Sequence, residues 1–258
     1  MSALSVALSA THHLRTTGLL WRADDLATAP RPGWPTGHAL LDTQLPGGGW
    51  PPGGLSELLV APGNGELRLL APLMQRLATG PTVAQPRELV WIAAPHPPCA
   101  AALAALGLAS ASLLWVHPRS SADAAWAAEQ ALRGGAAALV LWWCDVASTA
   151  TLRRLHLAAQ DTPLCLIGPP HWRERSSPAP LRLACSTDAE GRLCIDLFKR
   201  RGPPLAAPLR LDLPWPAGAR RPVAVPARLP TPVHHPDHAL AGHRSAAAAT
   251  AGSARLIA

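Results

Sequence analysis

The sequence predicts an α/β fold in which a mostly parallel sheet carries helices on both faces and is extended by antiparallel strands near its C-terminal end. Three observations favour this fold. A short apolar run, residues 55–60, leads through a glycine-rich turn into an amphipathic helix. Four further apolar runs begin at intervals of roughly 25 residues, the length that a strand and its crossover helix need. Three closely spaced runs follow between residues 181 and 213.

The first predicted strand, residues 55–60 (LSELLV), ends at a tight turn. The next residues, APGNG, combine proline, asparagine and glycine, which suit such a turn. A helix is predicted from residue 67, because apolar residues recur at helical spacing and polar residues fall on the other side. The apolar set is Leu67, Leu70, Ala71, Met74 and Leu77, and the polar set is Arg68, Gln75 and Arg76. Strand, glycine-rich turn and helix form the context that a phosphate-binding loop requires.

This loop lacks the residues that usually bind phosphate. The pattern G-x-x-x-x-G-K-[ST] holds phosphates with backbone N–H groups, neutralises them with lysine and binds magnesium through the hydroxyl. Here Gly63 and Gly65 are retained, but Glu66 replaces the lysine and Leu67 replaces the hydroxyl residue. A carboxylate about 4 Å from a phosphate costs on the order of 4 kcal/mol per unit charge at an effective dielectric constant near 20, which lowers affinity roughly a thousandfold.

We expect the Glu66 carboxylate to satisfy the helix N-terminus itself and to occupy the anion site permanently, because acidic side chains are favourable in a first helical turn. The alternative is an ordinary capped turn between a strand and a helix, with no nucleotide-binding history.

Further strands are predicted at residues 89–93, 113–116, 138–143 and 163–167. The clearest helix between them is predicted over residues 149–160. Ser148 or Thr149 can cap it, Leu152, Leu155 and Ala159 share one face, and Arg153 and Arg154 point away. Alternating strands and helices, with strands apolar on both faces, imply a parallel sheet that is covered on both sides. Most tryptophans in these strands are expected in the core, namely Trp91, Trp115, Trp142 and Trp143.

The pattern changes after residue 180. Residues 181–185, 193–198 and 209–213 are predicted as short strands, and the segment TDAEG between the first two suits a hairpin connection. An antiparallel extension of the parallel sheet accounts for them.

These boundaries predict one core with two flanking segments. The core covers residues 35–213. Residues 1–34 form an N-terminal arm and a proline-rich linker, with a short amphipathic helix around residues 19–26. Residues 214–258 are rich in proline, alanine, histidine and arginine and are predicted to be a disordered tail.

The net charge and the cysteines of the chain indicate which cellular compartment and which partners to expect. The formal net charge of +7 is carried almost wholly by arginine, with Lys199 the only lysine, so it reflects genome composition or nucleic-acid binding equally well. The five cysteines form no C-x-x-C pair and mostly lie in apolar runs, as expected for reduced thiols in a cytoplasmic protein. No secretory signal is evident. Residues 99–116 are predicted as a helix and a strand, not as a membrane span.

Several segments together resemble RecA-type cores. Residues 35–42 (PTGHALLD) and 47–57 (GGGWPPGGLSE) match the lead-in to the first strand and its loop. With residues 21–24 (WRAD) and 199–205 (KRRGPPL), they resemble more specifically the ImuA family, RecA-like and SulA-related accessory proteins encoded with bacterial error-prone polymerases. The resemblance spans about residues 20–213 and implies a RecA-like parallel sheet with helices on both faces.

Under this resemblance, the catalytic residues of active RecA are largely missing. The acidic residue that activates water would fall near His96, where the segment WIAAPH offers no carboxylate. Asp145 matches the Walker B aspartate, but this residue alone cannot hydrolyse ATP. An aspartate that ends a buried strand before a helix cap is the ordinary alternative. We therefore expect no enzymatic activity, no cofactor and no metal site.

Two stretches are candidate contact sites. Residues 168–177 (GPPHWRERSS) follow the fifth strand, where RecA-like proteins carry a DNA-facing loop. Trp172, Arg173 and Arg175 could offer a stacking face and phosphate contacts to single-stranded DNA, anchor a protein partner, or belong to an inert loop.

The second stretch is the basic cluster Lys199, Arg200 and Arg201. In the RecA-like picture it lies near the edge that meets a neighbouring subunit's nucleotide. An acidic partner or a phosphate backbone are its possible ligands, and a solvated strand end is the alternative. The tail histidines His234, His235, His238 and His243 lack clustered acidic or thiol ligands, so no native metal site is expected there.

The ImuA resemblance implies a non-catalytic adaptor in an SOS-induced complex for error-prone translesion DNA synthesis. Its implied partners are RecA, an ImuB-type Y-family polymerase subunit and an error-prone replicative-type polymerase subunit. DNA is a possible further partner, and a membrane is not. The alternative is a SulA-type inhibitor that acts on the tubulin-like division GTPase. Chain length favours ImuA, because the segment before Gly47 and the strands after Leu181 exceed a minimal SulA core. The altered loop argues against a third function, that of a working ATPase.

Overall fold

The computed structural model describes residues 31–79, 87–108, 113–202, 205 and 207–213. The predicted arm helix at residues 19–26, the tail over residues 214–258 and the tail histidines lie outside these residues. The predicted domain boundaries therefore stay predictions.

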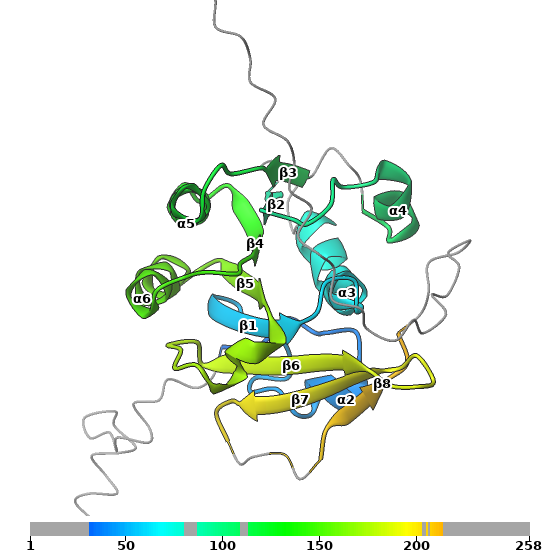
Figure 1. Ribbon diagram of the computed structural model, residues 1–258. Coiled ribbons are helices and arrows are strands. Elements are labelled where there is room, and N and C mark those ends of the chain that lie inside the picture. The colour runs from blue at the N-terminus through cyan, green and yellow to red at the C-terminus, as the bar shows by residue number, and fades with distance from the viewer. Residues whose placement is uncertain (1–30, 80–86, 109–112, 203–204, 206, 214–258) are drawn as a thin grey trace, which may run out of the picture. The chain divides into compact units, whose positions relative to one another are not determined.

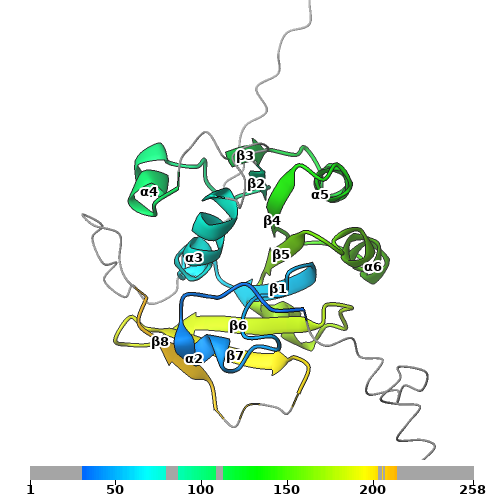
Figure 2. The same cartoon turned by 180° about the vertical axis from the view of Figure 1, so that it is seen from behind.

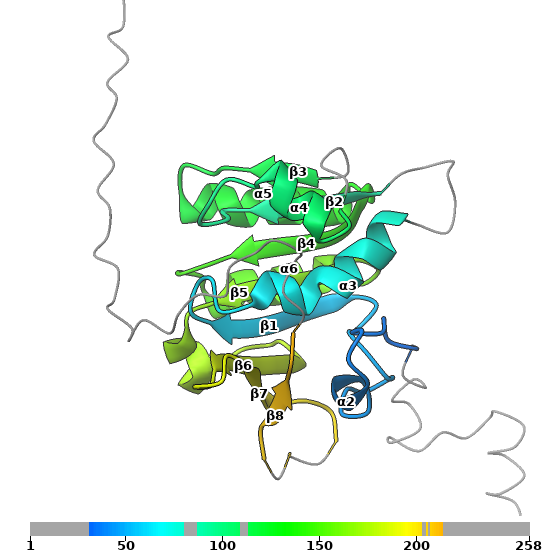
Figure 3. The same ribbon diagram turned by 90° about the vertical axis from the view of Figure 1, so that its right-hand side faces the viewer.

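The described part of the chain forms a sheet of eight strands in the order β3-β2-β4-β5-β1-β6-β7-β8 (Figures 1 and 3). The strands up to β6 pair in parallel, and β7 and β8 are added antiparallel. The bounds are β1 Gly54–Val60, β2 Glu88–Ile92, β3 Leu113–Val116, β4 Ala137–Trp143, β5 Pro163–Gly168, β6 Leu181–Thr187, β7 Leu193–Lys199 and β8 Leu209–Leu211. The predicted α/β, RecA-like fold with a C-terminal antiparallel extension is confirmed.

Helices cover both faces of the parallel part (Figures 1 and 2). The first face carries α2 (Ala39–Asp42), α3 (Glu66–Thr79) and α4 (Ala100–Ala105), and its core includes Leu58 and Met74. The opposite face carries α5 (Ser121–Arg133), α6 (Thr149–Ala158) and the 3₁₀ helix η2 (Pro170–Glu174), with Leu55 and Leu59 in its core. Because Leu58 and Leu59 alternate along β1, one strand contributes to both cores.

The predicted helix before β5 forms with Ser148 as its N-cap. The Ser148 hydroxyl accepts a hydrogen bond from the Thr151 N–H at 3.0 Å. Leu152, Leu155 and Ala159 are buried, as their shared face predicts. The helix ends at Ala158, slightly earlier than expected, because Ala159 forms the C-cap.

The predicted burial of the four strand tryptophans is correct for the inner strands and wrong for the strand that ends the sheet order. Trp91, Trp142 and Trp143 are buried, as expected. The prediction for Trp115 is wrong, because its side chain is 39% exposed. Trp115 lies on β3, which ends the sheet order and has only β2 as a strand neighbour in the described structure. Residues 99–116 contain α4 and β3, as predicted, and no described helix is long and apolar enough to span a membrane.

The lead-in segment, residues 33–53, belongs to the core. Trp34 and Trp50 form an antiparallel bridge with two backbone hydrogen bonds of 2.7 Å. Leu41, Leu45 and Trp50 are buried against the α3 face. Its glycines permit backbone to pass against backbone, since a Cβ atom on Gly53 would overlap the carbonyl group of Gln160.

A buried ion pair joins β1 to β6. Arg182 Nε lies 2.6 Å from Glu57 Oε2, and the side chains are 6% and 1% exposed. The Ser177 hydroxyl donates to the other Glu57 oxygen. Arg182 also donates to the carbonyl oxygens of Trp172 at 2.7 Å and Arg175 at 2.9 Å. These bonds satisfy both charges and fix the chain between β5 and β6.

We expect Arg182→Met to lower the free energy of unfolding by about 3–5 kcal/mol, because it leaves the Glu57 carboxylate buried without its counter-ion. Arg31→Met is the matched control. It removes the exposed ion pair between Arg31 and Asp161 and should cost less than about 1 kcal/mol. Urea denaturation followed by circular dichroism measures both. Equal effects of the two substitutions would contradict the assignment of Glu57 and Arg182 as the critical pair.

Candidate functional site

The altered phosphate-binding loop lies between β1 and α3, at the carboxyl edge of the parallel strands. Gly63 and Gly65 have φ angles of 80° and 97°, which non-glycine residues rarely adopt. The Glu66 carboxylate turns back into the loop, where its Oε1 accepts a hydrogen bond of 3.4 Å from the Gly63 N–H. Glu66 is buried, with 5% exposure, and Leu67 packs against the α3 core. The carboxylate thus uses a loop amide that a phosphate would otherwise bind.

A pocket of about 250 Å³ adjoins this loop, and we call it the loop pocket. Its wall includes Glu66 and Leu67, the residues 94–99 after β2, and Trp91 and Trp143. The two indole rings have centroids 5.4 Å apart and planes tilted by 59°. Glu66 Oε2 and both indole nitrogens are buried and have no hydrogen-bond partner in the described structure. The pocket is therefore mostly apolar, and three of the residues that line it each have a buried polar atom without a partner.

The segment after β2 provides no catalytic acid. It begins at Ala93, whose φ of 55° is unusual for a residue other than glycine, and this backbone strain could not be foreseen from the sequence. His96 is exposed and lines the loop pocket.

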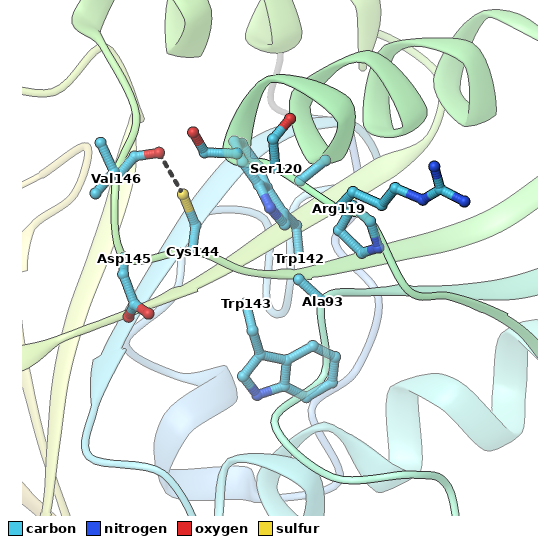
Figure 4. A pocket seen from close by; sticks show the side chains of 11 residues that line it. Ala93, Arg119, Ser120, Trp142, Trp143, Cys144, Asp145 and Val146 are labelled. Carbon is cyan, nitrogen blue, oxygen red and sulfur yellow. Dashed lines mark hydrogen bonds between the residues drawn. The ribbon is translucent and has the colours of Figure 1, made fainter. Parts of the chain in front are cut away.

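Asp145, the Walker B-like residue, is exposed directly after β4 (Figure 4). It lines a second pocket of about 290 Å³, together with Arg119 and Ser120 at the start of α5. Figure 4 shows Asp145 and Trp143 on one side of the chain and Trp142 and Cys144 on the other, as strand alternation requires. The described residues contain no group of three or more side chains able to hold a metal ion, at Asp145 or elsewhere.

The prediction of an exposed stacking face at Trp172 is wrong. Trp172 is 5% exposed and packs in the core beneath α5 and α6, because η2 turns its side chain inward. Arg175 covers the ring at 4.2 Å and donates to the Ala147 carbonyl oxygen. Arg173 is bound to Asp196 at 2.6 Å and stacks over the Phe198 ring. A base could therefore not stack on Trp172 without local unfolding, whereas contact roles for Arg173 and Arg175 stay predictions.

The side chains of Lys199, Arg200 and Arg201 point to different parts of the structure and do not form one basic surface. Lys199 donates to the Ser177 carbonyl oxygen at 2.7 Å, and Arg200 donates to the Gln44 carbonyl oxygen in the lead-in segment. Arg201 is exposed and lines a third pocket, of about 300 Å³, with Arg31 and His156. In the antiparallel register of β6 and β7, Lys199 lies opposite Arg182, near the start of β6. The cluster therefore lies at the amino ends of the parallel strands, whereas the loop lies at their carboxyl ends. The cluster residues and the loop residues therefore do not form a common site.

The two predicted contact stretches do meet each other across β6 and β7. Arg173 binds Asp196 of β7, and Lys199 binds Ser177 of the segment after η2. His156 lies near this region, and its Nδ1 accepts a hydrogen bond from the Leu55 N–H at 3.1 Å. Burial, with a smaller effect of the Lys199 charge, lowers the pKa of His156 below its ordinary value, which keeps Nδ1 available as an acceptor.

Comparison with known proteins finds a partial similarity. No family model matches the chain. Over 92 residues, the chain is 35% identical to the cell division inhibitor SulA of Edwardsiella piscicida; the match covers 36% of this chain and 52% of that protein. The chain thus spans about half the length of this relative. It also resembles the crystal structure of SulA from Pseudomonas aeruginosa, with 30% identity, a TM-score of 0.38, and coverage of 44% of this chain and 96% of that one. The sequence match is a partial similarity to SulA, and the ImuA role stays a prediction.

We expect the five thiols, all unpaired, to separate by reactivity. Burial raises the pKa of Cys144 and of Cys165 to about 12 and raises the pKa of Cys185. With Ellman's reagent at pH 7.5, Cys99 should react first because it is exposed, and Cys194 should react more slowly. The three buried thiols should react only after unfolding. Cys99→Ser is the control, and persistence of the first phase in this variant would contradict the assignment.

Proposed function

We propose that this protein is a non-catalytic regulator of the bacterial DNA-damage (SOS) response that acts by binding another protein, and that its target is the tubulin-like division GTPase. The supporting observation is the 35% identity over 92 residues to a protein named as a cell division inhibitor. A RecA-like fold offers the helices and loops of two sheet faces for such binding, without requiring chemistry at the sheet edge.

The geometry of the altered loop supports the absence of ATP hydrolysis. Hydrolysis by this fold needs a lysine, a hydroxyl and a metal-bound aspartate around the phosphates. Here the first position carries the buried carboxylate of Glu66, which accepts the Gly63 N–H, and the second carries the apolar Leu67. Asp145 remains, but a single carboxylate does not hold the metal and activate water.

A second candidate is the ImuA-type adaptor, with RecA, an ImuB-type polymerase subunit and an error-prone replicative-type polymerase subunit as partners. One observation favours it. The match to SulA covers 36% of this chain, and the described sheet and core are larger than that share, since they include the lead-in segment and β6 to β8. Arg200, which donates to Gln44, links the lead-in segment to the end of β7. The part of the chain outside the match offers surfaces for further partners, including DNA.

We expect overproduction of the protein in a rod-shaped bacterium to block division and produce filaments, since a protein that binds the division GTPase would withdraw it from division. Phase-contrast microscopy measures cell length, and co-expression of additional division GTPase should restore normal length. The destabilised Arg182→Met variant is the control for toxicity of the folded protein. Normal division at high levels of folded protein, together with co-purification of RecA or polymerase subunits after DNA damage, would instead support the adaptor.

We expect the purified protein to release phosphate from ATP at the background rate, with or without single-stranded DNA, because the loop carries a carboxylate where the lysine belongs. Asp145→Ala is the matched variant and should give the same background. ATP turnover that disappears in Asp145→Ala would overturn the non-catalytic assignment.

A further inference from the structure

The replacement of lysine by Glu66 reverses the charge that the start of α3 can bind. Glu66 Oε1 has one long hydrogen bond, 3.4 Å from the Gly63 nitrogen, and Oε2 is buried without a partner in the described chain. A buried carboxylate oxygen without a donor is unfavourable, because it has lost water and gained nothing in return. A group that brings positive charge and N–H donors to this oxygen would therefore be stabilised.

The loop pocket supplies the surroundings that such a group needs. Glu66 lines it together with Trp91 and Trp143, and the remaining wall is largely proline and aliphatic. Indole faces attract cations, and the attraction is stronger where water is excluded. At about 250 Å³, the pocket can hold one long side chain but offers little room for a nucleotide.

The charges around the pocket agree with this preference. Asp145, on the same side of β4 as Trp143, lines the neighbouring second pocket and forms no ion pair in the part of the chain that the structure describes (Figure 4). Arg68, the nearest arginine along α3, directs its guanidinium to the Leu213 carbonyl oxygen at 3.2 Å and does not line the pocket. His96 is the one basic side chain in the pocket wall. The wall of the loop pocket thus carries one carboxylate, that of Glu66, and no lysine or arginine, so it would repel phosphate.

We propose that the loop pocket binds an arginine side chain presented by a protein partner, with Glu66 as its counter-ion and the Trp91 and Trp143 rings as its walls. Arginine fits better than lysine, because its planar guanidinium stacks on aromatic rings and donates several N–H groups to one carboxylate. This inference rests on the proposed function only in assuming that the partner is a protein. The charge preference belongs to the pocket itself.

The test uses the whole protein and free amino-acid amides, so it does not depend on which partner is correct. The indole N–H signals of Trp91 and Trp143 are assigned in ¹H–¹⁵N spectra with Trp91→Phe and Trp143→Phe. N-acetyl-arginine amide is then added at millimolar concentrations. Both signals should shift and saturate, N-acetyl-lysine amide should bind more weakly, and N-acetyl-glutamate amide and ATP with magnesium should leave them unchanged.

Glu66→Gln keeps the shape of the side chain and should weaken arginine-amide binding at least roughly tenfold. Glu190→Gln, in the exposed turn between β6 and β7, is the matched control and should have no effect. Circular dichroism confirms the folding of both variants. If Glu66→Gln does not fold, the wild-type protein provides a second readout, because Cys99 is exposed and lines the same pocket, so arginine amide should slow its alkylation.

Three results would overturn the proposal: no saturable shift with arginine amide, equal binding by Glu66→Gln, or a stronger response to ATP. A negative filamentation assay would not affect this test. The assay asks which partner the protein binds, whereas the titration asks only whether the loop pocket binds arginine.

Discussion

The ion pair between Glu57 and Arg182 is the interaction on which the rest of the structure depends. Both side chains are buried between β1 and β6, the last parallel pair of strands before the antiparallel strands β7 and β8. Arg182 also binds the backbone of the segment around η2 and so places Trp172 in the core. Without this guanidinium, a buried carboxylate and a set of inward carbonyl groups would lack donors together, which makes the junction cooperative.

Strand β1, which carries Glu57, leads directly into the altered loop. In this loop, the backbone conformation and the chemistry of the side chains can be considered separately. The two glycines retain the left-handed φ angles that the turn needs, and the helix still begins directly after it. Only the side chains that face the anion site have changed. Backbone geometry and side-chain charge are therefore independent at this position, because the turn keeps its shape with a carboxylate in place of the lysine.

Much of the fold could be predicted from sequence because it follows from local patterns. Apolar runs located the eight strands of the described residues, and the spacing of apolar side chains in residues 149–160 identified the buried face of α6. The site was less predictable. The contacts of Arg182 with Glu57 and with the backbone at Trp172 join residues far apart in sequence, and no local pattern indicates them. The sequence analysis therefore missed the ion pair and expected Trp172 to be exposed. Trp115 was expected in the core because an apolar run does not reveal that its strand ends the sheet. The loop pocket likewise requires Trp91 and Trp143 from different strands.

The lack of a side chain at Gly53 has an effect beyond its own turn. A methyl group there would push against the Gln160 carbonyl at the end of α6, beside the hydrogen bond of 2.5 Å that Gly54 donates to Ala159. Displacing that bond would disturb the beginning of β1, the strand that carries Glu57 and leads to the turn before Glu66. The missing side chain at Gly53 is therefore part of what positions this strand.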